Sequence, residues 1–223
     1  MKTIALAAAK GGVGKTTIAA ALSICAAIAH PDRAVALLDL DPQGSLTGWW
    51  NDRATRTPAL YERGVGSIWA AKRQAAADGI ATLFLDCPPS FSHLLEEAIG
   101  AADLVLIPVG ASKLDLSAVE STAAMADRLD VPHRLVLNRA IYRSRIAGRA
   151  VITLRETGRM IWPPIHQRVA TPEAMAGGRT AIETEPGGRA AAELMALWHA
   201  VEQVLTATAG HRLIVERDLR VGL

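Results

Sequence analysis

Cysteine and aromatic residues are scarce in this 223-residue chain. The first scarcity argues against a metal site held by cysteines, and the second limits which residues can build the core. The two cysteines, Cys25 and Cys87, lie far apart without CxxC spacing, so one chain offers too few ligands for a structural zinc or an iron–sulfur cluster. We expect two buried free thiols, with a cluster bridging two chains as the alternative. Aromatic residues make up 4% of the chain, so the core must consist mainly of Ala, Leu, Ile and Val.

Long apolar runs are also missing. No stretch of about 18 apolar residues occurs, and residues 1–4 lead into an apolar run without the pattern of a signal peptide. We therefore expect a cytoplasmic protein. The length fits one large domain, and the sequence has neither internal repeats nor low-complexity linkers. We expect one compact domain at 1–207 and a C-terminal tail at 208–223.

The net charge of +2 is unevenly distributed. From Arg128 onward, 14 arginines oppose 9 acidic residues, whereas the preceding part has 10 basic and 13 acidic residues. Within this basic part, one stretch holds seven arginines opposed only by Glu156: Arg134, Arg139, Arg143, Arg145, Arg149, Arg155 and Arg159. Such a cluster indicates either a surface that binds nucleic-acid phosphates or a solvated helix face.

Apolar runs bounded by turn residues alternate with helical stretches, which is the pattern of repeated βα units around a parallel sheet. We predict strands at 3–8, 33–39, 81–86, 104–109 and 133–138, with a further short strand at 160–165. We predict helices at 16–30, 67–78, 91–101, 114–129, 144–158 and 186–206. The predicted class is α/β, with a mostly parallel sheet flanked by helices on both faces.

Residues 9–17 read AKGGVGKTT directly after the apolar run at 4–8, which predicts a phosphate-binding loop of the P-loop NTPase type. Glycines are needed because backbone amides must converge on the phosphates. We expect Gly11 and Gly12 to tighten the turn. Lys15 would reach the β and γ phosphates, and the hydroxyl of Thr16 would bind Mg²⁺. The N-terminus of the next helix adds its dipole to this anion site.

Lys10 is a residue that an ordinary phosphate loop does not require. Residues 10–16 fit the motif KGGxGK[ST], and in this the chain resembles the deviant Walker A ATPases, the group that includes ParA and MinD. In that family the first lysine of the motif reaches across a two-fold dimer to the phosphates of the partner's nucleotide. The alternative is an ordinary phosphate loop in which Lys10 is a solvated charge.

Three aspartates lie where predicted strands end, which is where open parallel sheets bind ligands. Carboxylates held near Thr16 can fix a magnesium ion that keeps several waters, so we expect Thr16, Asp39 and Asp86 to form the metal site. Residues 39–45, DLDPQGS, resemble the switch region of ParA proteins, where the aspartate before the proline, here Asp41, positions the attacking water. The alternative role for Asp41 is to cap a short helix that begins near Ser45.

The resemblance covers most of residues 1–207 and is closest to the short plasmid ParA proteins without an N-terminal helix-turn-helix domain. It includes PVGASKLDL at 108–116, LNR at 137–139, where the family contacts adenine, and IHQR at 165–168, which is similar to a segment that closes over the base. The catalytic residues it implies are Lys10, Lys15 and Asp41. The nucleotide-binding residues it implies are Lys10, Gly11, Gly12, Val13, Gly14, Lys15, Thr16, Thr17, Asn138 and Arg139.

The resemblance implies an enzyme that hydrolyses ATP to ADP and phosphate, slowly and under stimulation by a partner. It implies an ATP-dependent homodimer, nonspecific DNA binding on the nucleoid, and a ParB-like or cargo-adaptor partner in plasmid or chromosome partition. Candidate DNA-binding residues are Arg143, Arg145, Arg149, Arg179 and Arg189. The alternatives are the positioning of a protein assembly such as carboxysomes, a MinD-like regulator on the membrane, and a metal-cluster carrier. Against the membrane, the apolar residues of the tail at 208–223 do not gather on one helical stripe.

Overall fold

The computed structural model describes residues 1–61, 67–90 and 92–221, with the side chains of the last helix described as far as Thr208. At its centre is a sheet in which all strand pairs are parallel, in the order β3-β2-β4-β1-β5-β6. The strands are β1 (Lys2–Leu6), β2 (Ala34–Asp39), β3 (Ala59–Tyr61), β4 (Ile80–Asp86), β5 (Leu104–Val109) and β6 (His133–Leu137). The chain crosses β1 between β4 and β5, which makes the end of β1 a switch point where such sheets bind ligands.

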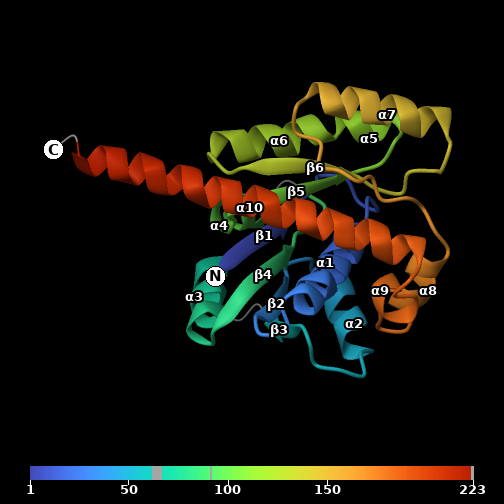
Figure 1. Ribbon diagram of the computed structural model, residues 1–223, viewed down its shortest axis with the longest axis horizontal. Helices are drawn as coiled ribbons and strands as arrows, with labels where there is room; N and C mark the ends of the chain where they lie inside the picture. The colour runs from blue at the N-terminus through green and yellow to red at the C-terminus, as the bar shows by residue number, and fades with distance from the viewer. Residues whose placement is uncertain (62–66, 91, 222–223) are drawn as a thin grey trace.

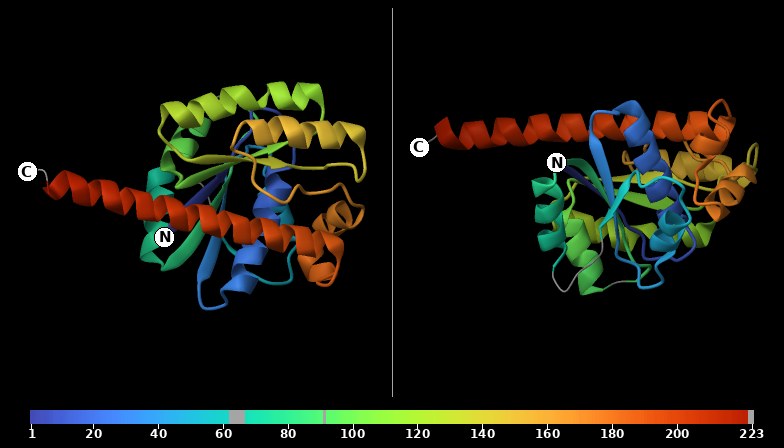
Figure 2. Two further views of the ribbon diagram at one scale, coloured as in Figure 1. Left: turned by 45° about the horizontal axis from the view of Figure 1, so that its top comes forward. Right: turned by 90° about the horizontal axis from the view of Figure 1, so that it is seen from below.

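Helices cover both faces of the sheet (Figures 1 and 2). They are α1 (Lys15–Ala29), α2 (Ser45–Asn51), α3 (Ile68–Ala77), α4 (His93–Ala101), α5 (Lys113–Ser117), α6 (Val119–Arg128), α7 (Arg145–Glu156), α8 (Ala170–Ala176), α9 (Ala181–Thr184) and α10 (Arg189–Val221). One apolar core joins the sheet to α3, α4, α6 and α7, and a second joins it to α1, α2, α9 and α10. Successive residues of β1 alternate between them: Ala5 belongs to the first core, and Ile4 and Leu6 belong to the second.

Burial on both faces explains why the strands are apolar runs rather than alternating sequences. Every residue of β5 is buried, because helices lie against both of its sides. The predicted α/β class is confirmed, and the sheet is entirely parallel where the sequence predicted a mostly parallel one.

The helix predicted at 114–129 is divided. A capping box formed by Ser112 and Asp115 begins α5, and Ala118, with ψ of −12°, separates α5 from α6. The strand predicted at 160–165 is also wrong, since only isolated bridges form near it, at Met160 and His166. Prolines at 163 and 164 explain this, because they lack the N–H groups that a strand ladder requires.

The final helix runs to Val221, beyond its predicted end at 206. It extends past the sheet at the side where the chain begins (Figure 1). The division of the chain at residue 207 stays a prediction, and the apolar side chains of the tail lie outside the described ones. Over the described residues, no helix is both long enough and apolar enough to cross a membrane.

Candidate functional site

The phosphate loop joins β1 to α1 at the switch point of the sheet. Gly12 and Gly14 have φ of 74° and 94°, a region that favours glycine, and a Cβ on Gly14 would overlap the side-chain amide of Asn138. Gly11 has no positive φ, so the tight positions are Gly12 and Gly14 rather than the predicted pair Gly11 and Gly12. Because α1 begins directly after the loop, at Lys15, its free N–H groups point toward the space that an anion would occupy.

Lys15 is almost fully buried behind this loop. Its Nζ donates to the carbonyl oxygens of Ala8 at 3.4 Å and Lys10 at 3.5 Å. Burial lowers the pKa of Lys15, and the neighbouring carboxylates, Asp86 first, oppose this shift. The ammonium group therefore lies in a partly desolvated position with few partners, which suits it to a phosphate oxygen.

Asp86 ends β4 beside the first turn of α1. Its Oδ2 accepts from the hydroxyl of Thr16 at 2.6 Å, whereas its Oδ1 is buried and has no hydrogen-bond partner among the described residues. Burial raises the pKa of Asp86 to about 7; Asp39 and Asp41 raise it further, while the Thr16 hydrogen bond and Lys15 oppose the shift. An unpaired buried carboxylate oxygen next to a threonine hydroxyl is the observation that fits a cation here.

Asp39 lies level with Asp86 across the β2–β4 pair, but its oxygens are already engaged. One accepts from Asp41 N at 3.1 Å, and the other accepts from Thr47 N at 2.8 Å and Thr47 Oγ1 at 2.9 Å. Asp39 is thus tied to the first turn of α2. Asp41 accepts from Gln43 N, and the N-cap position of α2 is Gly44 without a side-chain cap, so the alternative that Asp41 caps this helix is wrong.

The acidic groups are spread along the strand ends rather than gathered into a cage. In the described part of the chain, no three His, Cys, Asp or Glu side chains lie together in a way that could hold a metal ion. The arrangement of Thr16 and Asp86 therefore suits magnesium, which keeps waters and takes ligands from substrate phosphates, better than an ion that needs a complete protein cage.

Lys10 forms an ion pair with Asp115 in the first turn of α5, and its side chain is 42% exposed. Burial raises the pKa of Asp115, but hydrogen bonds from Lys10 and Ser112 lower it more, so the net shift is downward. Lys10 is therefore not simply a solvated charge. Sequence reasoning did not assign Asp115 a role, although the Ser112–Asp115 spacing is that of a capping box and could have located it at a helix start.

Asn138 and Arg139 follow β6 and contact the phosphate loop directly. Asn138 Nδ2 donates to Val13 O at 2.7 Å, and Arg139, with φ of 55°, donates to Gly12 O at 3.0 Å. The segment at 165–168 runs beside them, since Ala140 N donates to Ile165 O at 3.0 Å. The predicted base-contacting residues thus lie together at the end of β6.

Comparison with known proteins matches residues 4–181 to the family model described as the CobQ/CobB/MinD/ParA nucleotide binding domain. The chain belongs to this family. Maintenance of carboxysome distribution protein A of Halothiobacillus neapolitanus is 30% identical over 202 residues, which cover 86% of this chain and 91% of that protein. Chromosome-partitioning ATPase Soj of Thermus thermophilus is 31% identical over 231 residues, with 85% and 92% covered.

Among solved structures, the chain is similar to a putative plasmid partition protein from Borrelia burgdorferi bound to AMPPNP. The TM-score is 0.72 at 17% identity, over 91% of this chain and 98% of that one. A likeness at this identity concerns the fold alone, and it agrees with the family that the match over residues 4–181 shows.

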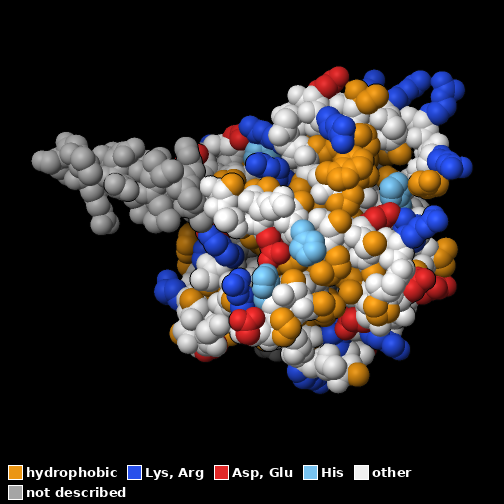
Figure 3. Space-filling model, viewed as in Figure 1, with side chains coloured by type: hydrophobic (Ala, Val, Ile, Leu, Met, Phe, Trp, Pro, Cys, Tyr) orange, Lys and Arg blue, Asp and Glu red, His pale blue; other side chains and the backbone are white. Residues whose placement is uncertain are grey.

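The arginines that the sequence singled out for DNA are all exposed. Two of them lie on α7, and Figure 3 shows basic side chains over the region of that helix. The aliphatic side chains of Ile146 and Ile152 are exposed beside them. The five form two groups: Arg143, Arg145 and Arg149 in and before α7, and Arg179 and Arg189 around α9.

Both cysteines are fully buried and free, as predicted. Cys25 belongs to the core of one sheet face and Cys87 to the core of the other, so the two thiols cannot meet within one chain. Burial raises the pKa of Cys25 to about 12 and also raises that of Cys87, which keeps both sulfurs protonated.

Proposed function

We propose that this chain is a ParA-like ATPase that pairs with a second copy when ATP is bound, binds DNA without sequence preference, and segregates or positions a cargo. The observation that carries the proposal is a lysine at the entrance of the phosphate loop, Lys10, in front of a site already assembled from Lys15, Thr16 and Asp86. The similarity to Soj and to the carboxysome distribution protein supports work in partition or positioning.

The phosphate loop binds the triphosphate. Backbone amides of residues 11–17 surround the phosphates, Lys15 neutralises charge on the β and γ groups, and the N-terminus of α1 adds its dipole. Lys10 leaves Asp115 and binds the phosphates of the partner's nucleotide. Loss of the γ phosphate removes the charge that holds two protomers together, so hydrolysis leads to dissociation of the dimer.

Thr16 and Asp86 would hold magnesium, and Asp39, which accepts from Thr47, lies level with Asp86 on the neighbouring strand. When bound, the ion neutralises charge that develops on the phosphate oxygens during transfer. Asp41 orients the water that attacks the γ phosphorus, and the products are ADP and phosphate. Asn138 and Arg139 bind the adenine.

The dimer requirement is tested by light scattering of a variant that binds but does not hydrolyse ATP. Asp41→Ala should form dimers with Mg-ATP and monomers with Mg-ADP, and its phosphate release should fall to background. Adding Lys10→Ala should abolish these dimers, because the cross-protomer cation is gone. Lys113→Ala, at the exposed lysine that begins α5, is the matched control and should leave them intact. Monomers in Asp41→Ala with Mg-ATP would refute the proposal.

DNA binding is tested by fluorescence anisotropy with duplexes of unrelated sequence. The Asp41→Ala dimer should bind all of them alike, and binding should weaken steeply as salt rises. Replacing Arg145 and Arg149 with Gln should weaken binding uniformly across sequences. Arg73→Gln, at an exposed arginine on α3, should not. Binding that does not depend on ATP would remove DNA from the proposed function.

The second candidate function is the positioning of a protein assembly, which the 30% identity to the carboxysome distribution protein favours. The identity of the cargo distinguishes this function from partition. The trapped Asp41→Ala dimer is the bait for a partner that accelerates wild-type phosphate release. A ParB-like protein that binds a centromere supports partition, and an adaptor bound to a protein assembly supports positioning. In cells, the tagged protein should lie on the nucleoid, and ATP-dependent sedimentation with liposomes would instead favour a MinD-like regulator.

A further inference from the structure

The order of the strands indicates which way a bound nucleotide points. The aspartates that would face magnesium and the γ phosphate end β2 and β4, on one side of β1. The loop between β1 and α1 would hold the phosphates at the end of β1. The nucleoside must therefore extend to the other side, over the ends of β5 and β6, where Asn138 lies against Val13.

The segment at 165–168 runs along this side of the site, next to the residues that follow β6. Ile165 N donates to Leu137 O at 2.8 Å, and Gln167 N donates to Ala140 O at 2.9 Å. These bonds hold one edge of the segment against the residues that contact the phosphate loop. Its other edge faces α10, a helix that begins more than twenty residues later in the chain.

Glu193 of α10 is the hydrogen-bond acceptor for the polar groups on that second edge. It accepts from His166 N at 3.1 Å and from the His166 ring at Nδ1 at 2.9 Å, and it pairs with the guanidinium of Arg168. The carboxylate side chain is 17% exposed. Burial raises its pKa, but the hydrogen bonds from Arg168 and His166 lower it more, so it carries its charge at neutral pH.

The rest of the described α10 contacts the sheet face through apolar side chains, among them Leu194, Leu197 and Trp198. Glu193 is a carboxylate at the edge of this apolar stripe with three donors from one segment. Removing it would leave the guanidinium of Arg168 and the His166 backbone N–H without their acceptor, and Arg168 Nε is already buried with no hydrogen-bond partner among the described residues. The neighbouring ring of Tyr142, 5.7 Å from that of His166, would then lose a fixed partner.

We propose that Glu193 is a positioning residue for nucleotide binding, because it fixes the segment at 165–168 as the wall of the nucleoside pocket. It thereby raises the affinity that the protein gains from contacts with the nucleoside, and not the affinity that it gains from the phosphates. This inference rests on the proposed function, because it requires that the phosphate loop bind a nucleoside triphosphate. It assigns α10 a role in ligand selection besides its packing on the sheet. Glu193 itself acts through His166 and Arg168 and does not touch the ligand.

The test compares ATP with inorganic tripolyphosphate, which has the phosphates but no nucleoside. Isothermal titration calorimetry in excess Mg²⁺ should give a dissociation constant for ATP about tenfold higher in Glu193→Gln than in wild type. The constant for tripolyphosphate should be unchanged. Glu193→Ala should raise the dissociation constant for ATP further, again without changing that for tripolyphosphate. Melting temperatures show that each variant is folded.

Glu202→Gln is the matched control. Glu202 also lies on α10 and pairs with a histidine, His30 at 2.5 Å, but this pair is at the C-terminal end of α1, away from the nucleotide. The control should change neither constant. An equal loss of affinity for both ligands in Glu193→Gln, or no loss for ATP, would overturn the inference while the proposed function stands. If wild type binds neither ligand, the proposed function fails instead.

Discussion

Asp86 is a buried carboxylate whose surroundings do not fully compensate its charge. One of its oxygens is buried without a partner among the described residues, and two further carboxylates lie near enough to raise its pKa. A buried charge of this kind costs stability unless a cation compensates it. The site thus favours a cation at a cost in folding stability, which is common at functional sites.

The pH dependence of stability follows from this carboxyl group. The pKa of Asp86 is raised from 3.8 to about 7, so between these values the folded state binds more protons than the unfolded state. The free energy of unfolding therefore falls as pH rises through this window, by an amount on the order of 4 kcal/mol, and levels off above it. Asp86→Asn should remove this fall and melt at a higher temperature than wild type at pH 8 without nucleotide.

The same variant should lose the stabilisation that Mg-ATP gives to wild type, because the side chain amide is a poor ligand for magnesium. Thermal melting across pH 4–8, with and without Mg-ATP, measures both effects. Asp32→Asn, at an exposed carboxylate in the turn after α1, is the control and should follow wild type. A pH profile shared by Asp86→Asn and wild type would contradict this account of Asp86.

Residues that act through local spacing could be predicted from sequence, and residues that act through distant contacts could not. The phosphate loop and the aspartates at strand ends are predictable because strand ends of a parallel sheet share one edge. The contacts of Lys10 with Asp115 and of His166 with Glu193 join positions 105 and 27 residues apart. No local pattern relates such positions, since only the packing of whole elements brings them together.

Glycines act at the scale of the elements, with opposite consequences in helices and in turns. Gly148 lies within α7, where a Cβ would meet no atom of the described residues within 4 Å. Gly178 lies in the turn after α8 with φ of +63°, and a Cβ there would lie 2.5 Å from the carbonyl group of Asp52. The first glycine lowers the stability of its helix relative to alanine, whereas the second permits two backbones to approach closely.

Substituting alanine at these two positions should therefore change stability in opposite directions. Gly148→Ala should raise the free energy of unfolding by about 0.5–1 kcal/mol, because alanine favours the helix and meets no clash. Gly178→Ala should lower it by more than about 1 kcal/mol, through strain and displacement of the backbone. Urea denaturation measures both. A stabilising Gly178→Ala would show that the turn is free to move away from Asp52.

Helices and strands with a strong apolar pattern could be predicted from the sequence. Short elements that depend on contacts with neighbouring segments could not. The runs that became β1, β2, β4, β5 and β6 are buried on both faces, so their composition alone marks them. β3 has only three residues, all half-buried, and carries too little pattern to be recognised. Helices α8 and α9 were also missed, because both are short and depend on neighbouring segments for their position.

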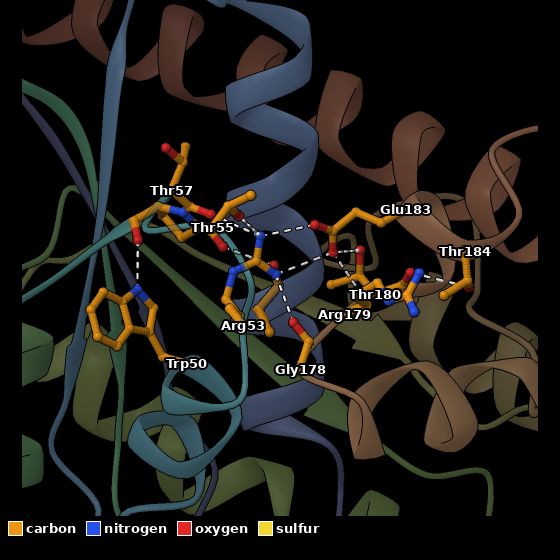
Figure 4. Close-up of polar contacts among 12 residues, drawn as sticks. Trp50, Arg53, Thr55, Thr57, Gly178, Arg179, Thr180, Glu183 and Thr184 are labelled. Atoms are coloured by element: carbon orange, nitrogen blue, oxygen red, sulfur yellow. Dashed lines mark hydrogen bonds and ion pairs between the residues drawn. The ribbon is translucent and has the colours of Figure 1, made fainter.

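At the scale of the whole molecule, a buried arginine joins parts of the chain that meet only in the folded state. Arg53 follows α2 and points into the turn between α8 and α9 (Figure 4). It donates to Gly178 O at 3.0 Å, to Thr57 O at 2.8 Å and to Glu183 at 2.8 Å, with its guanidinium 4.6 Å from the centre of the Trp49 ring. Its side chain is 3% exposed. Arg53 thus connects the region after the Asp41 segment to the elements that precede α10.

Arg53→Met should lower the free energy of unfolding by about 3–5 kcal/mol, because it leaves the partly buried Glu183 carboxylate without its counter-charge. Burial raises the pKa of Glu183, but hydrogen bonds from Arg53 and Thr180 lower it more. The stability gained from this depressed pKa is present at neutral pH and is lost as pH falls through the folded-state pKa, so the deficit of Arg53→Met should shrink in acid. Urea denaturation at pH 7 and in acid measures this.

Arg56→Met, at an exposed arginine over the Trp50 ring, is the control and should cost less than about 1 kcal/mol at either pH. Equal losses for Arg53→Met and Arg56→Met would show that the buried network does not hold α2 to the turn before α9.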